Sequence, residues 1–335
     1  MKERDSSIDI AKGIGIFLVV LGHTTSNEML LKWIYSFHMP LFFFLSGLFH
    51  SQGKNYKEFL MKKTRGLLVP YFSFAIILFL FFIIISKNIG FSAGENLSVK
   101  ENFMGIFIGT DIANFSQVSW GGQLWFLLAL FLVSNINYFL EKVSLKVQII
   151  LNIFFIFINI YLSKILNFYL PWCFLTVLMS INFYWSGKKL KNYILNMEYK
   201  TTIWLYLFFV VNLLISNYNL KVDMWRNIYG NVILFFIGAY SGIFFIIMFT
   251  KRFTLKYKIL EYIGKNSLVI LAFHRRAQTF TKVLVVFLLK TSISENNIIF
   301  DIFYSVWQIG LCIPIIYVLN KYFPCILGRE KNDKK

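Results

Sequence analysis

The sequence of 335 residues contains only three cysteines and four histidines. Cys173, Cys312 and Cys325 have neither a C-x-x-C spacing nor a metal-binding pattern, and free cysteine commonly behaves as a small buried apolar residue. The H-E-x-x-H, G-x-S-x-G, P-loop and G-x-G-x-x-G patterns are absent as well. We therefore expect packed cysteines, no metal site, and chemistry that depends on none of these common patterns.

Long polar segments are also missing. Hydrophobic residues make up 57% of the chain and the mean hydropathy is +0.63, whereas soluble domains contain roughly 45 to 50% apolar residues. A helix that crosses the hydrocarbon core needs about 20 mostly apolar residues. Stretches that fit this template lie at approximately 8–26, 33–50, 66–86, 119–139, 147–163, 168–186, 202–217, 229–250, 266–289 and 298–320. The longest polar connection, 87–119, has no strong periodicity of its own. We predict an all-α, polytopic membrane bundle with about ten transmembrane helices, which forms one integral membrane domain over residues 1–335.

Acidic residues are scarce, with 16 Asp and Glu against 34 Lys and Arg, for a net charge of +18. Most basic residues fall in alternate connections: 1–7, 51–65, 140–146, 187–201, 251–265 and 321–335. The intervening connections hold only Lys32, Lys87, Lys100, Lys164, Lys221, Arg226 and Lys290. By the positive-inside rule, this alternation places both termini in the cytoplasm. We interpret the basic clusters as topology signals that meet anionic membrane lipid, and we expect no nucleic-acid partner.

The first apolar segment contains three residues that are costly in lipid: Asp9, Lys12 and His23. Lys12 and His23 are 11 residues apart, which places them on one helix face about 16 Å apart along the axis. Asp9 precedes Lys12 by three residues, a spacing that favours an ion pair. Since no small-x-small cleavage site precedes Thr24, we expect this segment to remain as a helix. In the alternative interpretation, Asp9 and Lys12 reach the interface and His23 only bonds a neighbouring helix.

The second segment places His38 beside Pro40, and a proline inside a helix frees the carbonyl of Ser36 and bends the axis. His38 is then expected near the same cavity as His23, although a helix that begins at Pro40 also fits the sequence. His50, at the end of this segment, is interpreted as an ordinary boundary residue.

Segment 266–289 carries a basic stripe that includes Arg275 and Lys282 at helical spacing, with no carboxylate in the segment. Something anionic is expected to meet this stripe. The alternative is a helix that breaks at His274, so that the basic residues reach an interface. Our central hypothesis is that the charged and imidazole side chains of segments 8–26, 33–50 and 266–289 converge on one wet chamber that opens to both sides of the membrane.

Four stretches together resemble acyltransferase family 3, particularly its fucose O-acetylase-like branch. They are DIAKGIGIFLVVLGH (Asp9 to His23), FHMPLFFFLSGLF (Phe37 to Phe49), WGGQLWFLLALF (Trp120 to Phe131) and IGKNSLVILAFH (Ile263 to His274). The resemblance implies a ten-span enzyme of the bacterial cytoplasmic (inner) membrane. It also implies transfer of an acyl group, commonly acetyl from cytoplasmic acetyl-CoA, to a sugar hydroxyl of a surface polysaccharide or lipid-linked glycan. His23 is implied as the leading catalytic histidine, with a basic partner at Lys12, where most of the family has arginine.

O-acyl transfer requires a base near neutral pKa, which imidazole supplies. We expect His23 to act as that base, with Lys12 and His38 also in the catalytic set. Arg275, Arg276 and Lys12 are the candidates for binding acyl-CoA, and Arg275 and Arg276 also for contacting the oxyanion. Asp9, Trp125 and His274 are the candidates for binding substrate, although aromatic residues such as Trp125 also anchor helices at interfaces.

A secondary transporter or a flippase of a lipid-linked glycan is the alternative function, since buried basic groups also suit substrate sites at midmembrane. No internal repeat supports this alternative. No motif identifies the acceptor sugar or the modified hydroxyl, none distinguishes direct transfer from a covalent acyl-enzyme, and none indicates an oligomeric state.

Overall fold

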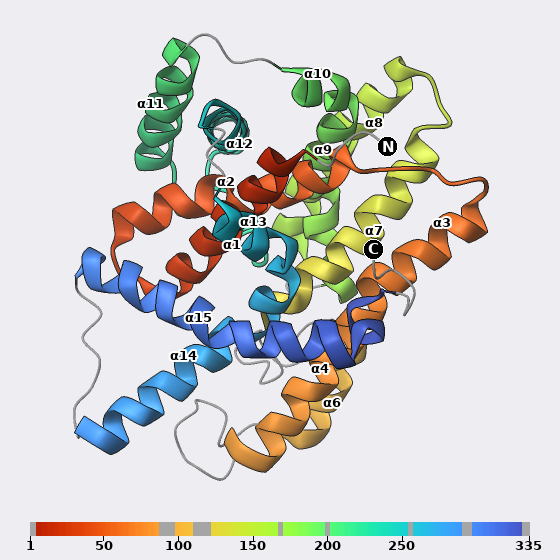
Figure 1. Ribbon diagram of the computed structural model, residues 1–335. Coiled ribbons are helices and arrows are strands. Elements are labelled where there is room, and N and C mark those ends of the chain that lie inside the picture. Colours follow the sequence, from red (N-terminus) through yellow and green to blue (C-terminus); the bar gives the residue numbers. More distant parts are fainter. Residues whose placement is uncertain are drawn as a thin grey trace. The chain divides into compact units, whose positions relative to one another are not determined.

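The computed structural model describes residues 5–86, 98–109, 122–166, 170–197, 202–253, 257–289 and 297–329. These residues are mainly helical (Figure 1). Within them, the extended pairing consists of an isolated antiparallel bridge between Asp223 and Ile228. The prediction of an all-α fold is confirmed.

Each predicted span coincides with a helix. In order these are α1 (Ser6–Thr24), α2 (Glu28–Leu48), α4 (Val69–Phe81), α7 (Trp125–Leu140), α8 (Leu145–Ile165), α9 (Phe174–Lys189), α11 (Thr202–Tyr218), α12 (Val232–Arg252), α14 (Ser267–Leu289) and α15 (Ile298–Tyr322). Seven helical segments among the described residues are long and apolar enough to cross a membrane, including the continuous helix Tyr56–Ile84. The helices α9 and α11 are shorter, with 16 and 17 residues. The helix α14 is less apolar than these seven segments, because it carries Arg275, Arg276 and Lys282 near its middle.

Short helices also form in connections that the hydropathy pattern left unassigned. They are α3 (Tyr56–Lys63), α6 (Val99–Ile108), α10 (Lys191–Asn196) and α13 (Lys258–Lys265). The sequence showed no strong periodicity in the connection 87–119, but the helix α6 forms within it. There, the Ser98 side chain accepts a hydrogen bond from the Glu101 amide, and Gly109 ends the helix with φ 75°. The helix that contains α4 begins earlier than predicted, because Asn55 caps α3 and a π-helical segment, Thr64–Leu68, joins α3 to α4.

The chain divides into two compact units. The first unit contains Met1–Phe49 and Phe183–Ile316, and the second contains His50–Asn182 and Tyr317–Lys335. The first unit carries α1, α2, α11, α12, α13, α14 and most of α15. It therefore contains the three segments in which the sequence places most of the candidate site.

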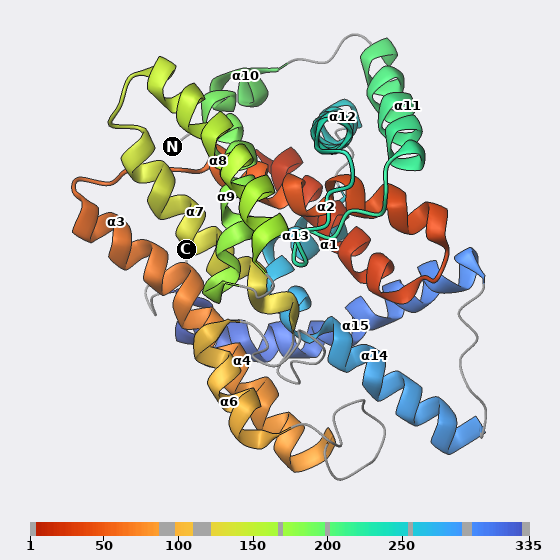
Figure 2. The same cartoon turned by 180° about the vertical axis from the view of Figure 1, so that it is seen from behind.

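Close helix crossings at glycine hold the first unit together. A Cβ atom at Gly264 of α13 would overlap the Asp9 carbonyl oxygen of α1, and one at Gly13 would overlap the Leu260 carbonyl oxygen of α13. A Cβ atom at Gly242 of α12 would likewise overlap the ring of Phe37 in α2. Small residues allow such approaches between membrane helices. In Figures 1 and 2, α13 accordingly lies beside α1, and α11 runs beside α12.

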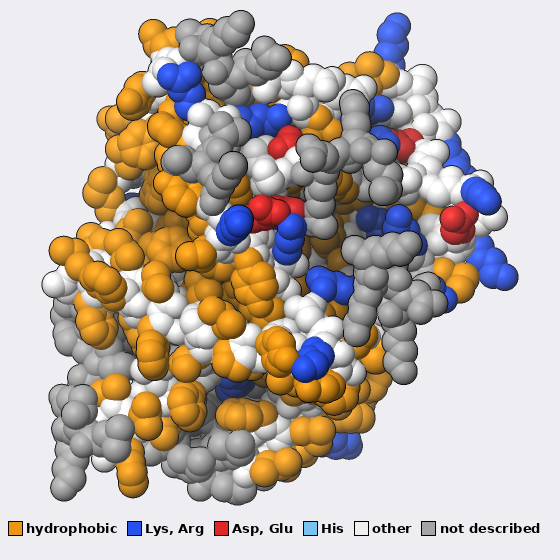
Figure 3. Space-filling view, in the orientation of Figure 1, with side chains coloured by type: hydrophobic (Ala, Val, Ile, Leu, Met, Phe, Trp, Pro, Cys, Tyr) orange, Lys and Arg blue, Asp and Glu red, His pale blue; other side chains and the backbone are white. Residues whose placement is uncertain are grey.

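The outer surface of the first unit is largely apolar. Hydrophobic side chains dominate the part of the visible face over α11, α2 and α15 (Figure 3). Ile203 and Tyr206 of α11, and Ile299 and Phe303 of α15, are each more than 60% exposed. Such a surface is costly in water and favourable in lipid, which agrees with the membrane-spanning length of α15 and the apolar character of α11.

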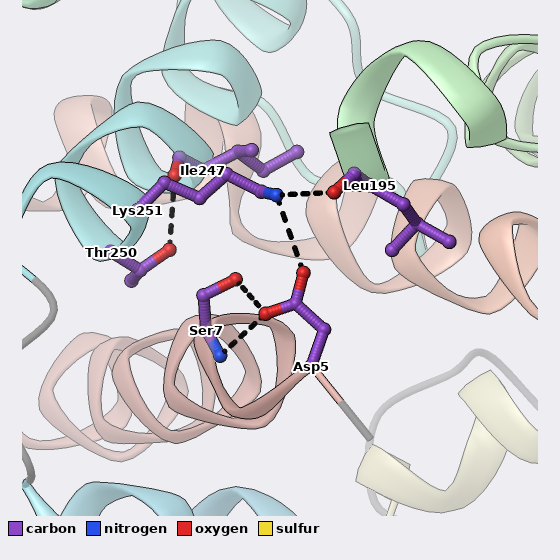
Figure 4. A network of polar contacts seen from close by, with 6 residues as sticks. All are labelled: Asp5, Ser7, Leu195, Ile247, Thr250 and Lys251. Carbon is purple, nitrogen blue, oxygen red and sulfur yellow. Dashed lines mark hydrogen bonds and ion pairs between the residues drawn. The ribbon is translucent and has the colours of Figure 1, made fainter. Parts of the chain in front are cut away.

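A polar network fixes the beginning of α1 (Figure 4). Asp5 caps the helix by accepting a hydrogen bond from the Ser7 amide at 3.0 Å. The Lys251 ammonium of α12 lies 3.3 Å from the Asp5 carboxylate and donates to the Leu195 carbonyl of α10 at 3.1 Å. The Lys251 ammonium therefore links three elements that are far apart in sequence, and the start of α1 is held against α10 and α12.

Candidate active site

His23 and His274 meet where the last turn of α1 faces α14. Their rings stack with centroids 5.2 Å apart and an interplanar angle of 25°. The Gln278 side chain of α14 donates to the His23 carbonyl at 3.3 Å, which ties the end of α1 to the same helix. Because α14 is continuous from Ser267 to Leu289, the alternative of a helix broken at His274 is wrong.

The surroundings of His274 fix its tautomer. Its Nδ1 atom lies 3.0 Å from both the Ile270 and the Leu271 carbonyl oxygens. A carbonyl can only accept a hydrogen bond, so Nδ1 carries the proton and Nε2 presents a lone pair. The ring is fully buried, and Nε2 has no hydrogen-bond partner within the described part of the chain. A buried acceptor without a partner is unusual and marks a position for a functional hydrogen bond.

His38 repeats this arrangement on α2. Its Nδ1 atom lies 2.8 Å from the Ile34 carbonyl oxygen, so the same reasoning assigns the proton to Nδ1 and the lone pair to Nε2. The helix α2 begins at Glu28 and continues through Pro40, so the alternative of a helix that begins at Pro40 is wrong. Asn212 of α11 holds this region by donating to the Ser36 hydroxyl at 3.1 Å and to the Gly238 carbonyl of α12 at 2.7 Å.

The charged groups around His23 come from two directions. Arg275 of α14 and Lys221, which follows α11, both act electrostatically on the His23 ring, together with His38 and His274. No carboxylate belongs to this group of interacting residues among those that the structure describes. The candidate site therefore combines three imidazoles with two positive charges. Such a group is suited to accept a proton and to stabilise negative charge nearby.

Sequence reasoning missed Lys221 and Tyr35. The Lys221 ammonium lies 4.5 Å from the centroid of the Tyr35 ring, and that ring meets His38 edge-on at 4.8 Å. Neither residue belongs to a periodic polar face, since Lys221 lies in a connection and Tyr35 in an aromatic stretch. Only the folded chain brings them to the histidines.

A polar face of α15 was also missed. The Gln308 side chain donates to the Thr24 hydroxyl at 2.9 Å, next to His23, and the Tyr304 hydroxyl donates to the Gln278 carbonyl at 3.1 Å. Asp301 and Ser305 are buried on the same face. Their spacing of i, i+3, i+4 and i+7 was readable in the sequence as a stripe that needs a polar environment.

Lys12 and Asp9 form a separate pair nearer the start of α1. The Lys12 ammonium lies 3.6 Å from the Asp9 carboxylate and 4.9 Å from the centroid of the Phe49 ring. Asp9 is 1% exposed, which is more buried than an interface position requires. Since α1 is continuous, Lys12 lies about 16 Å along its axis from His23. The pair thus belongs to the other end of the helix and not to the histidine cluster.

The remaining candidates have different surroundings. Arg275 is exposed and Arg276 is half-buried on α14. Trp125 is buried at the first turn of α7 in the second unit, and Trp120 lies outside the described residues. His50 also belongs to the second unit; it lies just beyond the end of α2 and is 1% exposed, with Nε2 3.5 Å from the Glu141 carboxylate.

Metal ligands are not clustered in the part of the chain that the structure describes: no group of three or more His, Cys, Asp or Glu could hold an ion there. Cys173 and Cys312 are buried and unbridged, while Cys325 is exposed.

Comparison with known proteins extends over almost the whole chain. A family model described as an acyltransferase domain matches residues 5–317, a range that includes every candidate residue named above. No curated protein and no solved structure matches the chain. The chain belongs to acyltransferase family 3 and is a multi-pass membrane acyltransferase.

Proposed function

We propose that this protein is an O-acetyltransferase of the fucose O-acetylase-like branch, which moves acetyl from cytoplasmic acetyl-CoA to a sugar hydroxyl of a surface polysaccharide or lipid-linked glycan. The observation that carries the proposal is the stacked pair of His23 and His274 at the end of α1. Family membership favours acyl transfer over the transporter or flippase alternative.

His23 is the base in this mechanism. It is half-buried, whereas His274 is fully buried, so His23 is the more accessible imidazole of the pair. His23 takes the proton of the sugar hydroxyl while that oxygen attacks the thioester carbonyl carbon. As the new C–O bond forms and the C–S bond breaks, the protonated ring returns its proton to the departing CoA sulfur.

Arg275 stabilises the oxyanion that develops on the thioester carbonyl. Arg275 directly follows His274 on α14, its charge acts on both stacked imidazoles, and a cation near developing negative charge lowers the barrier. Lys12 is too distant from His23 for this role. A long pantetheine arm separates the CoA thioester from its phosphates, so Lys12, and Arg276 on α14, are assigned to the phosphates of the donor.

His38 completes the polar wall of the site, and His274 orients the His23 ring. Trp125 and Asp9 remain predicted substrate contacts; Asp9 acts through its pairing with Lys12. The protein is placed in the bacterial inner membrane, with lipid around its apolar surface and with both termini in the cytoplasm.

Two linked measurements test the proposed function. Membranes that contain the protein are incubated with acetyl-CoA radiolabelled in the acetyl group and with glycan from a strain that lacks the gene. Mass and NMR analysis of the glycan from that strain, compared with its parent, then identifies the acceptor. Label in the glycan and a missing O-acetyl group are expected. The transporter or flippase alternative would be indicated by two results together. The glycan would carry no label, and the glycan of the deletion strain would keep the O-acetylation of its parent but be mislocalised.

A further inference from the structure

The connection between α11 and α12, residues 219–231, is a fixed structure beside the candidate site. The Asn219 side chain donates to the Tyr229 carbonyl at 3.0 Å and accepts from the Asn231 amide at 2.9 Å. Two backbone hydrogen bonds of 2.7 and 2.9 Å pair Asp223 with Ile228. A connection tied in this way can hold a side chain in one place at little entropic cost on binding.

This connection holds Lys221 against α2. The ammonium lies over the face of the Tyr35 ring, whose edge contacts His38. The Tyr35 hydroxyl lies 3.5 Å from the carbonyl oxygen of Gly22, the residue that precedes His23. Tyr35 thus connects Lys221 to His38 and to the backbone just before His23, and its ring holds the ammonium by a cation–π contact.

The charge in this region is mainly positive. Among the described residues, Lys221 makes no ion pair with a carboxylate, and it is exposed. Asp223 is the acidic residue of the connection, and its carboxylate lies 3.8 Å from the Arg226 guanidinium. The charges of Asp223 and, to a smaller extent, of Arg275 on α14 act on Tyr35, and Arg275 also acts on His23. An exposed ammonium that is held in place and not neutralised suits the binding of an anion.

We propose that Lys221, oriented by Tyr35, binds an anionic group of the acyl acceptor, a carboxylate or a phosphate near the sugar, and so places the hydroxyl at His23. This inference rests on the proposed function, and it adds that the acceptor is negatively charged. The donor phosphates are assigned to Lys12, about 16 Å along α1 from His23, and to Arg276 of α14, so Lys221 has no assigned role toward the donor and can serve the acceptor. The carboxylate would belong to an acidic sugar and the phosphate to a phosphate-linked sugar.

The test measures equilibrium binding to the full-length protein in detergent by titration calorimetry. The probes are methyl glucoside, which is neutral, methyl glucuronide, which carries a carboxylate, and glucose 1-phosphate. At least one anionic probe is expected to bind about tenfold more tightly than methyl glucoside, the effect of one charge-assisted contact. The preferred anion distinguishes the acidic sugar from the phosphate-linked sugar.

Variants assign that preference to Lys221. Lys221→Gln should remove the tenfold preference for the anion, whereas Lys221→Arg should retain most of it, and neither should change the KM for acetyl-CoA. Lys164→Gln is the matched control. Lys164 is an exposed lysine in the last turn of α8, and the sequence places it on the same side of the membrane as Lys221. No anion preference in the wild type, unchanged preference in Lys221→Gln, or equal loss in Lys164→Gln would overturn the inference.

The outcomes separate this inference from the proposed function. Lys221-dependent anion binding without any acetyl transfer to the glycan would reject the proposed function and leave the anion site standing. Acetyl transfer to the glycan with no anion preference would reject only the assignment of Lys221. Size-exclusion profiles that match the wild type show that each variant is folded.

Discussion

At the scale of single residues, the account depends on how histidine protons are held by the helices themselves. His38 and His274 each direct Nδ1 to a carbonyl of the preceding turn, which leaves Nε2 as an acceptor. Asparagine can make the same contact with its amide, as Asn152 does to the Gln148 carbonyl at 2.8 Å. An asparagine in place of such a histidine therefore keeps the hydrogen bond to the helix carbonyl but lacks the Nε2 acceptor and the imidazole ring.

This comparison predicts the behaviour of His274 variants. His274→Asn should keep the folded state, because the contact with the Ile270 carbonyl is retained. Its kcat should fall by about 100-fold, because the ring that orients His23 is lost. Melting temperature and initial rates of acetyl transfer check both parts. A variant that melts like the wild type and transfers acetyl at the wild-type rate would show that His274 has no part in catalysis.

Lys12 and Asp9 give a prediction about charge. Lys12→Met leaves a buried carboxylate without this partner and should cost about 2 kcal/mol of stability, less than the roughly 3–5 kcal/mol of a fully buried pair, because the Lys12 side chain is 23% exposed. Lys12→Arg keeps the charge and should retain substantial activity.

A double variant separates stability from donor binding. Asp9→Asn combined with Lys12→Met should recover most of the lost stability, because the buried carboxylate charge is then removed together with the ammonium. It should still show a raised KM for acetyl-CoA. Recovery of a wild-type KM in the double variant would contradict the assignment of Lys12 to the donor.

At the scale of elements, the crossing of α1 and α13 is the feature with the clearest consequence. Gly264→Ala would place a methyl group against the Asp9 carbonyl oxygen and force the helices apart. A loss of about 1–3 kcal/mol in unfolding free energy is expected, with lower activity. Gly310→Ala on α15 is the control, because a Cβ atom there meets nothing within 4 Å. Denaturation that affects both variants equally would contradict the proposed role of this crossing.

The helices that the sequence predicted well are those whose apolar length alone identifies them. The basic stripe on α14 and the ion pair of Asp9 with Lys12 were also predictable, since both depend on spacing along one helix. Lys221 and Tyr35 were not, because their contact joins a connection to a helix distant in sequence. The polar face of α15 was readable from Asp301 to Gln308 but is hidden by the high average hydropathy of that helix.

At the scale of the whole molecule, the alternation of basic connections predicts which connections face the cytoplasm, and this topology can be tested by labelling. Ser51 and Ile228 are exposed residues of connections predicted on opposite sides of the membrane. In a Cys325→Ser background, Ile228→Cys should react with an impermeant thiol reagent added to intact cells whose outer membrane has been opened. Ser51→Cys should react only after the inner membrane is disrupted. Labelling of both from the same side would contradict the proposed topology.

The central claim is that the imidazole at the end of α1 removes the proton from the acceptor hydroxyl. It is tested most directly by the rate of acetyl transfer from acetyl-CoA to deacetylated glycan, with purified wild-type protein and with His23→Ala. The account predicts that His23→Ala keeps its folded size-exclusion profile while kcat falls by about 100-fold to 10,000-fold, the range of general-base catalysis. A folded His23→Ala protein that acetylates the glycan at the wild-type rate would contradict it.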